Sequence, residues 1–287
     1  MMFLATFLIQ ALFVTAALAF PSSRLGERMA ARRARRSSST HQSKPVNLIA
    51  SPDVTNTSQT TSSASVEFSE NWAGAILVSA NQTYQSIEGT FIIPNIRSLP
   101  LQIGVEQCVS IWVGIDGDTC DNAIMQVGLD LCIPQGIEPT SIVGESQFFP
   151  AASVDFEGFS FSAGQSVTLV VNVIGDLGNA GTLVIENNSS GQSMVREVTA
   201  PSGPNLCQAN AEWIVEDPET CSSDNDCSLF PFPDFTTVMF TSASAFTTSG
   251  GTSTPATAQI LDMEQNGILA TTTVSGDTVT IEFTGPV

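Results

Sequence analysis

Two glutamates share one face of a strand-like stretch in the second half of the chain. Glu212 and Glu216 lie four positions apart within residues 210–217, which are otherwise largely apolar. Successive side chains of an extended strand alternate sides, so both carboxyls and Ile214 point the same way. A buried carboxylate is costly unless it is protonated, paired or hydrogen-bonded. The stretch therefore indicates either a solvated strand face or a site of acid–base chemistry.

An amide lies on a second stretch of the same kind. Residues 112–120 place Trp112 and Asp116 on one face before an Asp-Gly turn, and residues 123–130 place Gln126 and Asp130 together. An uncharged amide among apolar residues can donate a hydrogen bond where negative charge develops. Taken alone, Gln126 also fits an ordinary solvent-facing residue. The two aspartates fit structural acids held by turn amides.

The three tryptophans have two possible roles. Trp72, flanked by Ala73 and Gly74, can be a core anchor or a platform for substrate. We expect Trp72 and Trp112 to be platforms and Trp213 to lie on the opposite, packed face of its strand.

Charge is distributed very unevenly over the 287 residues, which carry a formal net charge of −19. Seven of the nine basic residues precede position 45, so the rest carries two arginines against 27 acids, or 2 − 27 = −25. Because residues 45–287 (the body of the chain) are so negative, nucleic acid and anionic membranes repel them, and we expect neither as a partner. Its self-repulsion falls as carboxyls protonate, which predicts an acidic working environment.

Several catalytic chemistries are missing from the body of the chain. His41 is the only histidine and Lys44 the last lysine. If the segment holding them is removed, Ser-His-Asp and Cys-His catalysis, histidine-bound zinc and lysine Schiff bases are excluded. Carboxylates, amides, hydroxyls and backbone groups remain, and we expect no metal or cofactor.

The first 65 residues differ in composition from the rest. Residues 1–19 are an apolar run that predicts a secretory signal peptide, with an uncleaved anchor as the alternative because no basic residue precedes it. Residues 20–65 are basic and rich in Ser and Thr, which predicts a disordered propeptide cut after Arg36. Its positive charge suits a contact with the anionic body. The alternative is a merely solvated tail.

Residues 66–287 predict one all-β domain. Short β-branched and aromatic runs, such as Trp72–Val78 and Asn210–Glu216, recur about every ten residues between Gly, Asn, Asp, Ser and Pro, with no helical period of useful length. About a dozen to fourteen strands favour one double-sheet domain over two domains. Nothing demands more than a monomer. The six cysteines fit a secreted protein and permit fifteen pairings.

Four blocks together resemble the fungal glutamic peptidases, or eqolisins, in the order of that family. They are residues 71–75 (Asn-Trp-Ala-Gly-Ala), 112–120, 123–128 and 210–217. The resemblance covers roughly residues 68–285. It implies a β-sandwich of two seven-stranded antiparallel sheets, a concanavalin-like jelly roll. It also implies a metal-free acid endopeptidase that acts on polypeptides through a Gln/Glu dyad.

Carried over by motif, the resemblance assigns roles to particular residues. The dyad is Gln126 and Glu216, with Glu216 as general base on a water and Gln126 stabilising the oxyanion. Asp130 and Glu212 are possible supports of the site. The residues implied to contact substrate are Trp72, Trp112, Asp116 and Phe149. The implied disulfides are Cys120–Cys207 and Cys221–Cys227, with Cys108 and Cys132 as extra cysteines.

One block departs from the family pattern. Where the family has a block rich in Tyr and Trp around a glutamate, this chain has residues 144–150, Gly-Glu-Ser-Gln-Phe-Phe-Pro. Aligned on Pro150, the glutamate of that block becomes Gln147 and its final tyrosine becomes Phe149. An aromatic wall is kept, but a hydroxyl is lost, and a carboxylate too unless Glu145 substitutes for it.

Two other functions compete with proteolysis. A glycosidase could use Glu212 and Glu216, but four residues of strand separate them by roughly 13 Å, longer than either usual spacing of such carboxyls. A carbohydrate-binding or inactive β-sandwich could use Trp72 and Trp112 as platforms. That alternative gains weight if the altered block at residues 144–150 has cost the protein its activity.

Overall fold

The computed structural model describes residues 40–50 and 66–286, apart from positions 103, 138–139, 202 and 224–225. Within these residues the chain forms strands and three short 3-10 turns, with no α-helix, which confirms the all-β prediction. In this part of the chain there is accordingly no helix long and apolar enough to cross a membrane. The predicted signal peptide and the proposed cut after Arg36 lie outside the described residues.

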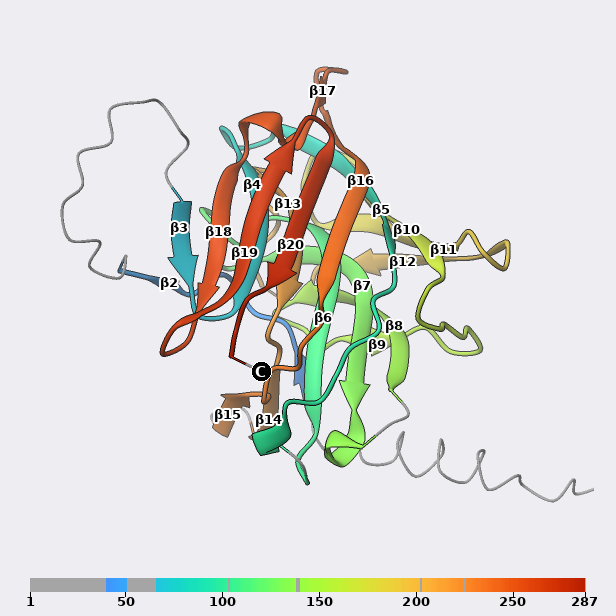
Figure 1. The fold of residues 1–287 in the computed structure, drawn as a ribbon. Coiled ribbons are helices and arrows are strands. Elements are labelled where there is room, and N and C mark those ends of the chain that lie inside the picture. Colours follow the sequence, from blue (N-terminus) through green and yellow to red (C-terminus); the bar gives the residue numbers. More distant parts are fainter. Residues whose placement is uncertain are drawn as a thin grey trace, which may run out of the picture. The chain divides into compact units, whose positions relative to one another are not determined.

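Figure 1 shows the strands, coloured in their order along the chain. Their bounds are β1 Thr40–Gln42, β2 Leu48–Ile49, β3 Val66–Ser69, β4 Trp72–Val78, β5 Tyr84–Ile92, β6 Gln107–Ile115, β7 Ile124–Ile133, β8 Ser141–Phe149, β9 Val154–Asp155, β10 Ser166–Val173, β11 Ala180–Asn187, β12 Gln192–Thr199, β13 Asn210–Glu216, β14 Glu219–Ser223, β15 Asp226–Leu229, β16 Thr237–Thr247, β17 Thr252–Ser253, β18 Gln259–Glu264, β19 Ile268–Ser275 and β20 Thr278–Phe283. The 3-10 turns are Pro100–Gln102, Pro134–Gly136 and Pro255–Thr257.

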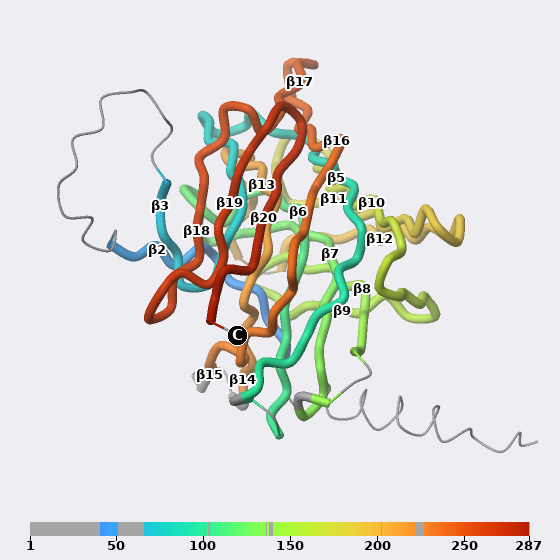
Figure 2. Tube along the Cα trace, in the orientation of Figure 1, coloured from blue at the N-terminus to red at the C-terminus, as the bar shows by residue number. Residues whose placement is uncertain are grey.

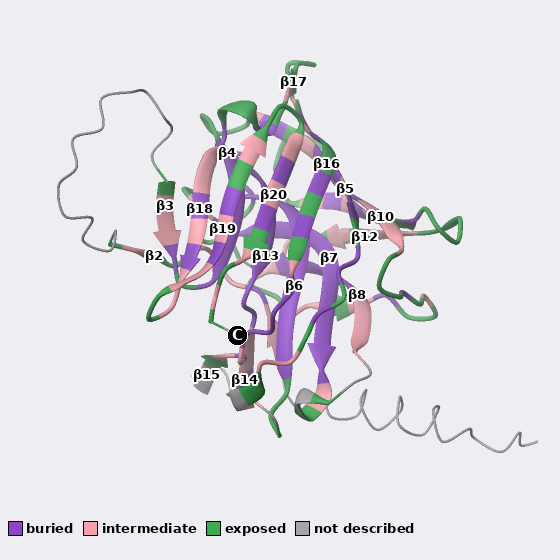
Figure 3. Cartoon of the chain, in the orientation of Figure 1, coloured by how far each residue is buried: buried purple, intermediate pink, exposed green. Residues whose placement is uncertain are grey.

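One layer is built around β13, which pairs antiparallel with β4 on one side and β6 on the other. Beyond β6 come β7, β8 and the short β9. Beyond β4 come β18, β19 and β20, and β3 joins β18 in parallel. Figure 3 shows that β6 and β7 are buried along their whole length, as every residue of β13 is. The strand that opens the sequence argument thus lies inside the sheet, not at its edge.

A second set of strands runs β16–β5–β10–β11–β12. Strand β16 belongs to both sets: its first half pairs with β20 and its second half with β5. The pairing shifts between Thr241 and Ser244, where Ser242 has a φ of 52°, and such irregularities let a strand pass from one sheet to another. The pairings therefore form one network of 17 strands. The division into two sheets of seven strands stays a prediction.

The main apolar core contains the inward faces of both sets of strands. Along β10 and β11 buried residues alternate with more exposed ones, as expected where one face packs and the other meets solvent. Trp213 is fully buried in this core, and its indole N–H donates to the Glu88 carbonyl at 2.9 Å. The prediction that Trp213 lies on the packed face is confirmed.

The expectation of disorder across residues 20–65 is wrong for residues 40–50. Residues 39–287 form one compact unit, in which β1 pairs with β14 and β2 with β3. In Figure 2 this segment, coloured blue, runs between β3 and the β14–β15 end of the unit. It is polar, so composition predicted a solvated chain. Backbone pairing holds it instead, and backbone groups leave no mark in the composition.

Three disulfides join the six cysteines. The structure contains Cys120–Cys207 and Cys221–Cys227, the pairs that the family resemblance implies. Cys108–Cys132, which the sequence left open, links directly opposed residues of β6 and β7.

Candidate active site

One face of the sheet β4–β13–β6–β7–β8 collects most of the predicted site residues. In one row of this face Glu212 lies opposite Gly114, Gly114 opposite Gln126, and Gln126 opposite Gln147. The row of Glu216 lies four residues further along β13 and includes Trp72, Ser110 and Asp130. Because side chains two residues apart share a face, the register brings carboxyls, amides and tryptophans to the same side.

Glu216 is 1 % exposed and has its two carboxyl oxygens in different contacts. The indole Nε1–H of Trp112 donates to Oε2 at 2.7 Å, and the backbone N–H of Lys44 donates to Oε1 at 3.0 Å. Burial raises the pKa of Glu216 to about 8, although the hydrogen bonds from Lys44 and Trp112 act in the opposite direction. With residues 43–46 in place, Glu216 is therefore a neutral acid over the acidic range.

Gln126 is oriented by a second amide. Its Nε2 donates to Oε1 of Gln147 at 2.9 Å, while Nε2 of Gln147 donates to the Ala151 carbonyl at 2.9 Å and the Ser43 carbonyl at 3.3 Å. Because both donors of Gln147 face carbonyls, its oxygen must face Gln126 and receive an N–H. This fixes the amide of Gln126 in one orientation and leaves its second N–H for another acceptor.

Trp72 and Trp112 pack edge to face, with ring centroids 4.9 Å apart. Both are fully buried, and they form a small apolar cluster separate from the main core. Phe149 packs on this cluster from β8, and Val46 packs on it from the segment between β1 and β2. The predicted platforms are therefore brought together and covered by the chain's own residues.

Asp130 is 1 % exposed and accepts a hydrogen bond from the Ser110 hydroxyl at 2.5 Å. Its other carboxyl oxygen lies 2.6 Å from Nδ1 of His41 on β1, whose ring also packs on Phe230 with centroids 4.7 Å apart. Glu145 lies on β8 opposite Gly128 and is also buried. Asp130 thus contacts the bound segment through His41.

Glu212 is fully buried beside the amide of the predicted dyad. A Cβ placed on Gly114 would lie 3.0 Å from the Glu212 carboxyl and 3.3 Å from Cβ of Gln126, so the two side chains flank this glycine. Neither carboxyl oxygen of Glu212 has a hydrogen-bond partner among the described residues. Burial, followed by the charges of Asp116 and Asp118, raises its pKa well above the ordinary range. Glu212 is therefore held as a neutral acid.

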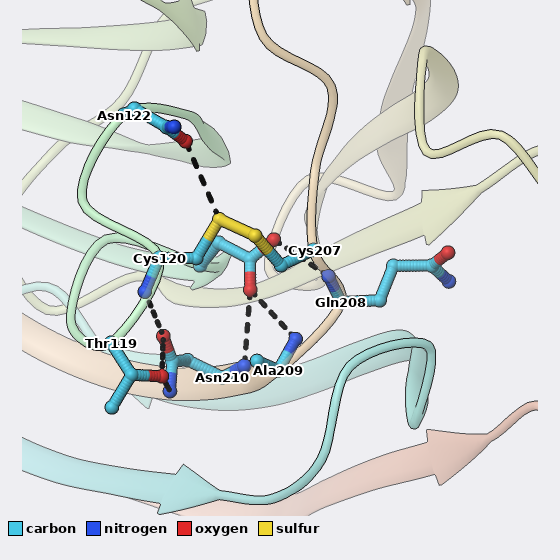
Figure 4. Close-up of a disulfide and its surroundings, with 8 residues drawn as sticks. Thr119, Cys120, Asn122, Cys207, Gln208, Ala209 and Asn210 are labelled. Atoms are coloured by element: carbon cyan, nitrogen blue, oxygen red, sulfur yellow. Dashed lines mark hydrogen bonds between the residues drawn. A yellow bond between two sulfur atoms is a disulfide. The ribbon is translucent and has the colours of Figure 1, made fainter.

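The carboxyl of Asp116 is bound by backbone N–H groups of a neighbouring loop. It is fully buried and has a φ of 69°, and its carboxylate accepts the backbone N–H groups of Gln208 (2.8 Å), Ala209 (2.8 Å) and Asn210 (3.1 Å). Beside it, the Cys120–Cys207 disulfide joins the same two loops (Figure 4). Asp116 therefore fixes the start of β13, as the structural-acid alternative expects, and its contact with substrate stays a prediction.

Groups that could hold a metal are few in the described part of the chain. Three of the four close groups of His, Cys and acidic side chains include disulfide sulfurs, which are not thiolate ligands. The fourth is His41, Asp130 and Glu145, and it depends on the segment before residue 45. The predicted absence of a metal cofactor stays a prediction.

Sequence reasoning did not place three parts of this site. Gln147 was noted only as a departure from a family motif, yet it is the hydrogen-bond partner of Gln126. Asn71 binds the segment of residues 45–47 through both ends of its amide. The segment itself was predicted to be disordered. A motif alignment could find Gln147, but nothing in the sequence locates the polar segment on this face.

Residues 70–283 match the Peptidase A4 family. This chain belongs to that family. Aspergillopepsin-2 of Aspergillus niger is 35 % identical over 295 residues, spanning 97 % of this chain and 99 % of its own length. Scytalidopepsin B of Scytalidium lignicola is 33 % identical over 216 residues, spanning 74 % and 77 % respectively. The chain is thus a glutamic-type peptidase, and the resemblance given by the four sequence blocks is confirmed.

Solved structures agree with this assignment. Scytalido-glutamic peptidase with a transition-state analogue inhibitor is 32 % identical, with a TM-score of 0.66, covering 75 % of this chain and 98 % of the other. Aspergilloglutamic peptidase from Aspergillus niger is 40 % identical, with a TM-score of 0.55, covering 62 % and 99 %. The peptidase domain therefore shares its all-β architecture with both.

Proposed function

We propose that this glutamic peptidase is a secreted acid endopeptidase whose catalytic dyad is Glu216 and Gln126. The observation that carries the proposal is the placement of one backbone segment, residues 43–46, between the Glu216 carboxyl and the amide pair Gln126–Gln147. Relatives solved with a peptide-based transition-state analogue and with the tripeptide Ala-Ile-His support a peptide as the occupant.

The residue types supply each step of peptide hydrolysis. Ionised Glu216 takes a proton from a water that attacks the scissile carbonyl carbon. The free N–H of Gln126 donates to the oxygen of the tetrahedral intermediate, because Gln147 holds the amide in the required orientation. Glu216 then returns the proton to the leaving nitrogen. The indole of Trp112 keeps the carboxyl in place throughout.

The protonation state of Glu216 links activity to release of the covering segment. While residues 43–46 bury it, its raised pKa keeps it neutral and unable to act as a base. When that segment leaves, water reaches the carboxyl and its pKa returns toward the ordinary range. A fraction of Glu216 is then ionised in acid, where an acid endopeptidase works.

Residues 20–65 act in this proposal as a propeptide and residues 1–19 as a secretion signal. The basic groups of the segment meet acidic groups of the domain: His41 pairs with Asp130, and the Lys44 ammonium with Glu219. Acid lowers the negative charge of the domain as a whole, which weakens its attraction for the basic segment and favours release. The three disulfides suit an oxidising, extracellular location.

One assay tests the proposed function. The processed protein is incubated at about pH 3–4, where ordinary carboxyls titrate, first with denatured protein and then with polysaccharide. We expect cleavage of the protein and no effect on the polysaccharide. Polysaccharide binding or cleavage without proteolysis would contradict the proposal and favour the carbohydrate alternatives.

A further inference from the structure

Arg196 is one of only two basic residues after position 44, and it joins strands of both sets. It lies on β12, the last strand of the set β16–β5–β10–β11–β12. Its Nη1 donates to the Val154 carbonyl at 2.6 Å and to the Ser146 hydroxyl, and its Nη2 donates to the Asp155 carbonyl at 2.8 Å. All three acceptors belong to β8 or β9. The side chain therefore ties β12 to the end of the layer that carries the candidate site.

The guanidinium holds together the two ends of the corner between β8 and β9. Ser146 lies on β8, and its own hydroxyl donates to the Val154 carbonyl of β9 at 3.1 Å. The guanidinium carbon of Arg196 lies 4.4 Å from the centroid of the Phe156 ring, which follows β9. A planar guanidinium can make several directed hydrogen bonds and stack on a ring at the same time, whereas an ammonium is a compact point charge. Residues 150–153, which connect the two strands, are thus fixed at both ends.

This corner supplies an acceptor that orients Gln147. Ala151 lies within it, and its carbonyl accepts a hydrogen bond from Nε2 of Gln147 at 2.9 Å. The other acceptor of that Nε2, the Ser43 carbonyl, belongs to the segment that covers the site. When the segment leaves, the Ala151 carbonyl is the acceptor that the domain itself still provides. The oxygen of Gln147 then continues to face Gln126 because Ala151 stays in place.

We propose that Arg196 is a positioning residue for the catalytic amide, acting through the corner at residues 150–153. This inference rests on the proposed function. Arg196 keeps the Ala151 carbonyl against Gln147. Gln147 in turn holds the amide of Gln126, whose second N–H meets the developing negative charge of the oxyanion. A donor that is displaced loses mainly the stabilisation of the transition state, so the loss appears in kcat.

The hydrogen bonds of Arg196 suit an enzyme that works in acid. An ion pair with a carboxylate is lost once the carboxyl is protonated, whereas a guanidinium stays charged and carbonyl and hydroxyl acceptors do not titrate. The charges of Asp155 and Glu157 also attract the guanidinium, and acid removes that attraction. The hydrogen bonds to two carbonyls and to Ser146 remain. The corner is therefore held at the pH where the proposed reaction runs.

The test measures kcat and KM of the processed protein on one peptide substrate at about pH 3–4. Arg196→Met keeps a long apolar side chain but removes the charge and the hydrogen bonds. We expect kcat to fall at least about threefold, and no further than in Gln147→Leu. KM should change little, because Phe149 keeps its packing on the cluster of Trp72 and Trp112.

The other arginine of the body supplies the matched control. Arg97 is 67 % exposed and pairs with Asp234, so Arg97→Met removes the same charge from another part of the protein. We expect Arg97→Met to keep wild-type kcat. A fall in kcat equal to that of Arg196→Met would overturn the inference, because the effect would then follow from net charge alone.

A double-mutant cycle separates positioning from a general loss of stability. Gln147→Leu already breaks the link between the corner and Gln126, so adding Arg196→Met should not lower kcat further. Equal falls in kcat with and without Gln147→Leu would overturn the inference. Arg196→Lys keeps the charge and should recover part of kcat. Where circular dichroism shows Arg196→Met to be unfolded, Arg196→Lys carries the same comparisons.

One further variant in the same assay reports on the proposed function by itself. If Glu216→Gln is inactive while Arg196→Met keeps wild-type kcat, the inference fails and the proposed function stands. If Glu216→Gln cleaves the substrate as the wild type does, the proposed function fails, and the inference fails with it.

Discussion

Gln147 is the residue that best shows how this site departs from its family pattern while keeping its geometry. The family block has a glutamate where this chain has an amide, yet that amide receives an N–H from Gln126 and donates to the Ala151 carbonyl. An amide does not titrate in the acidic range, so the orientation of Gln126 does not depend on the protonation of its neighbour. The lost carboxylate is therefore compatible with catalysis.

Replacing Gln147 tests this positioning role. In Gln147→Leu the acceptor for Gln126 is lost, so we expect kcat to fall about tenfold or more, with little change in KM, because orientation matters most in the transition state. Steady-state kinetics on a peptide substrate measures the split. Gln147→Glu restores an acceptor and should recover kcat with a new dependence on pH. A Leu variant with wild-type kcat would show that Gln147 only packs.

At the scale of elements, the central strands were predictable and the strand next to Gln126 was not. The predicted stretches Trp72–Val78 and Asn210–Glu216 coincide with β4 and β13, because apolar and aromatic residues dominate both. Strand β8 contains Gly, Glu, Ser and Gln in its middle and lacks such a run, although its centre is buried. Glu145 and Gln147 of this strand share the face that carries the site, so the polar residues that build the site also hide the strand from sequence analysis.

The binding of residues 40–50 was also beyond sequence reasoning. Their contacts run through backbone groups and through partners distant in sequence, such as Asn71 and Asp130. Composition reports how much apolar surface a segment can bury, and this segment buries little beyond Val46. The dyad, in contrast, came from motif residues, and both members lie on the face that alternation assigned to Glu216.

Strand β6 provides an element-scale prediction at Gly114. An added Cβ would lie 2.9 Å from the Trp112 ring and 3.0 Å from the Glu212 carboxyl, both fully buried. We expect Gly114→Ala to displace Trp112, and with it the hydrogen bond to Glu216, so kcat/KM should fall at least tenfold, about 1.4 kcal/mol. Gly203→Ala, whose added Cβ would meet only the Pro201 carbonyl oxygen at 3.9 Å, is the control for general effects of a glycine change. Unchanged activity in Gly114→Ala would contradict the tight packing.

At the scale of the whole molecule, buried carboxyls make stability depend on pH. Burial raises the pKa of Glu216 to about 8, and raises those of Glu212 and Asp217 well above their ordinary range. Above the ordinary glutamate pKa of about 4.3 the unfolded chain releases these protons while the folded chain keeps them. The unfolded state then binds fewer protons, so the free energy of unfolding falls as pH rises.

Thermal unfolding of the full chain checks this sign. One pKa unit on one carboxyl corresponds to about 1.4 kcal/mol, and 1 kcal/mol shifts Tm by about 2–4 °C in a domain of this size. We therefore expect Tm to fall by ~10 °C or more from about pH 4 to about pH 8. A Gln126→Ala background prevents self-cleavage during the scan, and adding Glu212→Gln should flatten the slope. A Tm that rises over this range would contradict the account.

The central claim is that Glu216 and Gln126, and not the two glutamates of β13, form the catalytic dyad. The most direct measurement is kcat/KM on one peptide substrate at about pH 3–4 for Glu216→Gln, Gln126→Ala and Glu212→Gln, each shown to be folded by circular dichroism. We expect the first two to lose at least ~100-fold and Glu212→Gln to retain activity. Activity in Glu216→Gln together with its loss in Glu212→Gln would contradict the dyad.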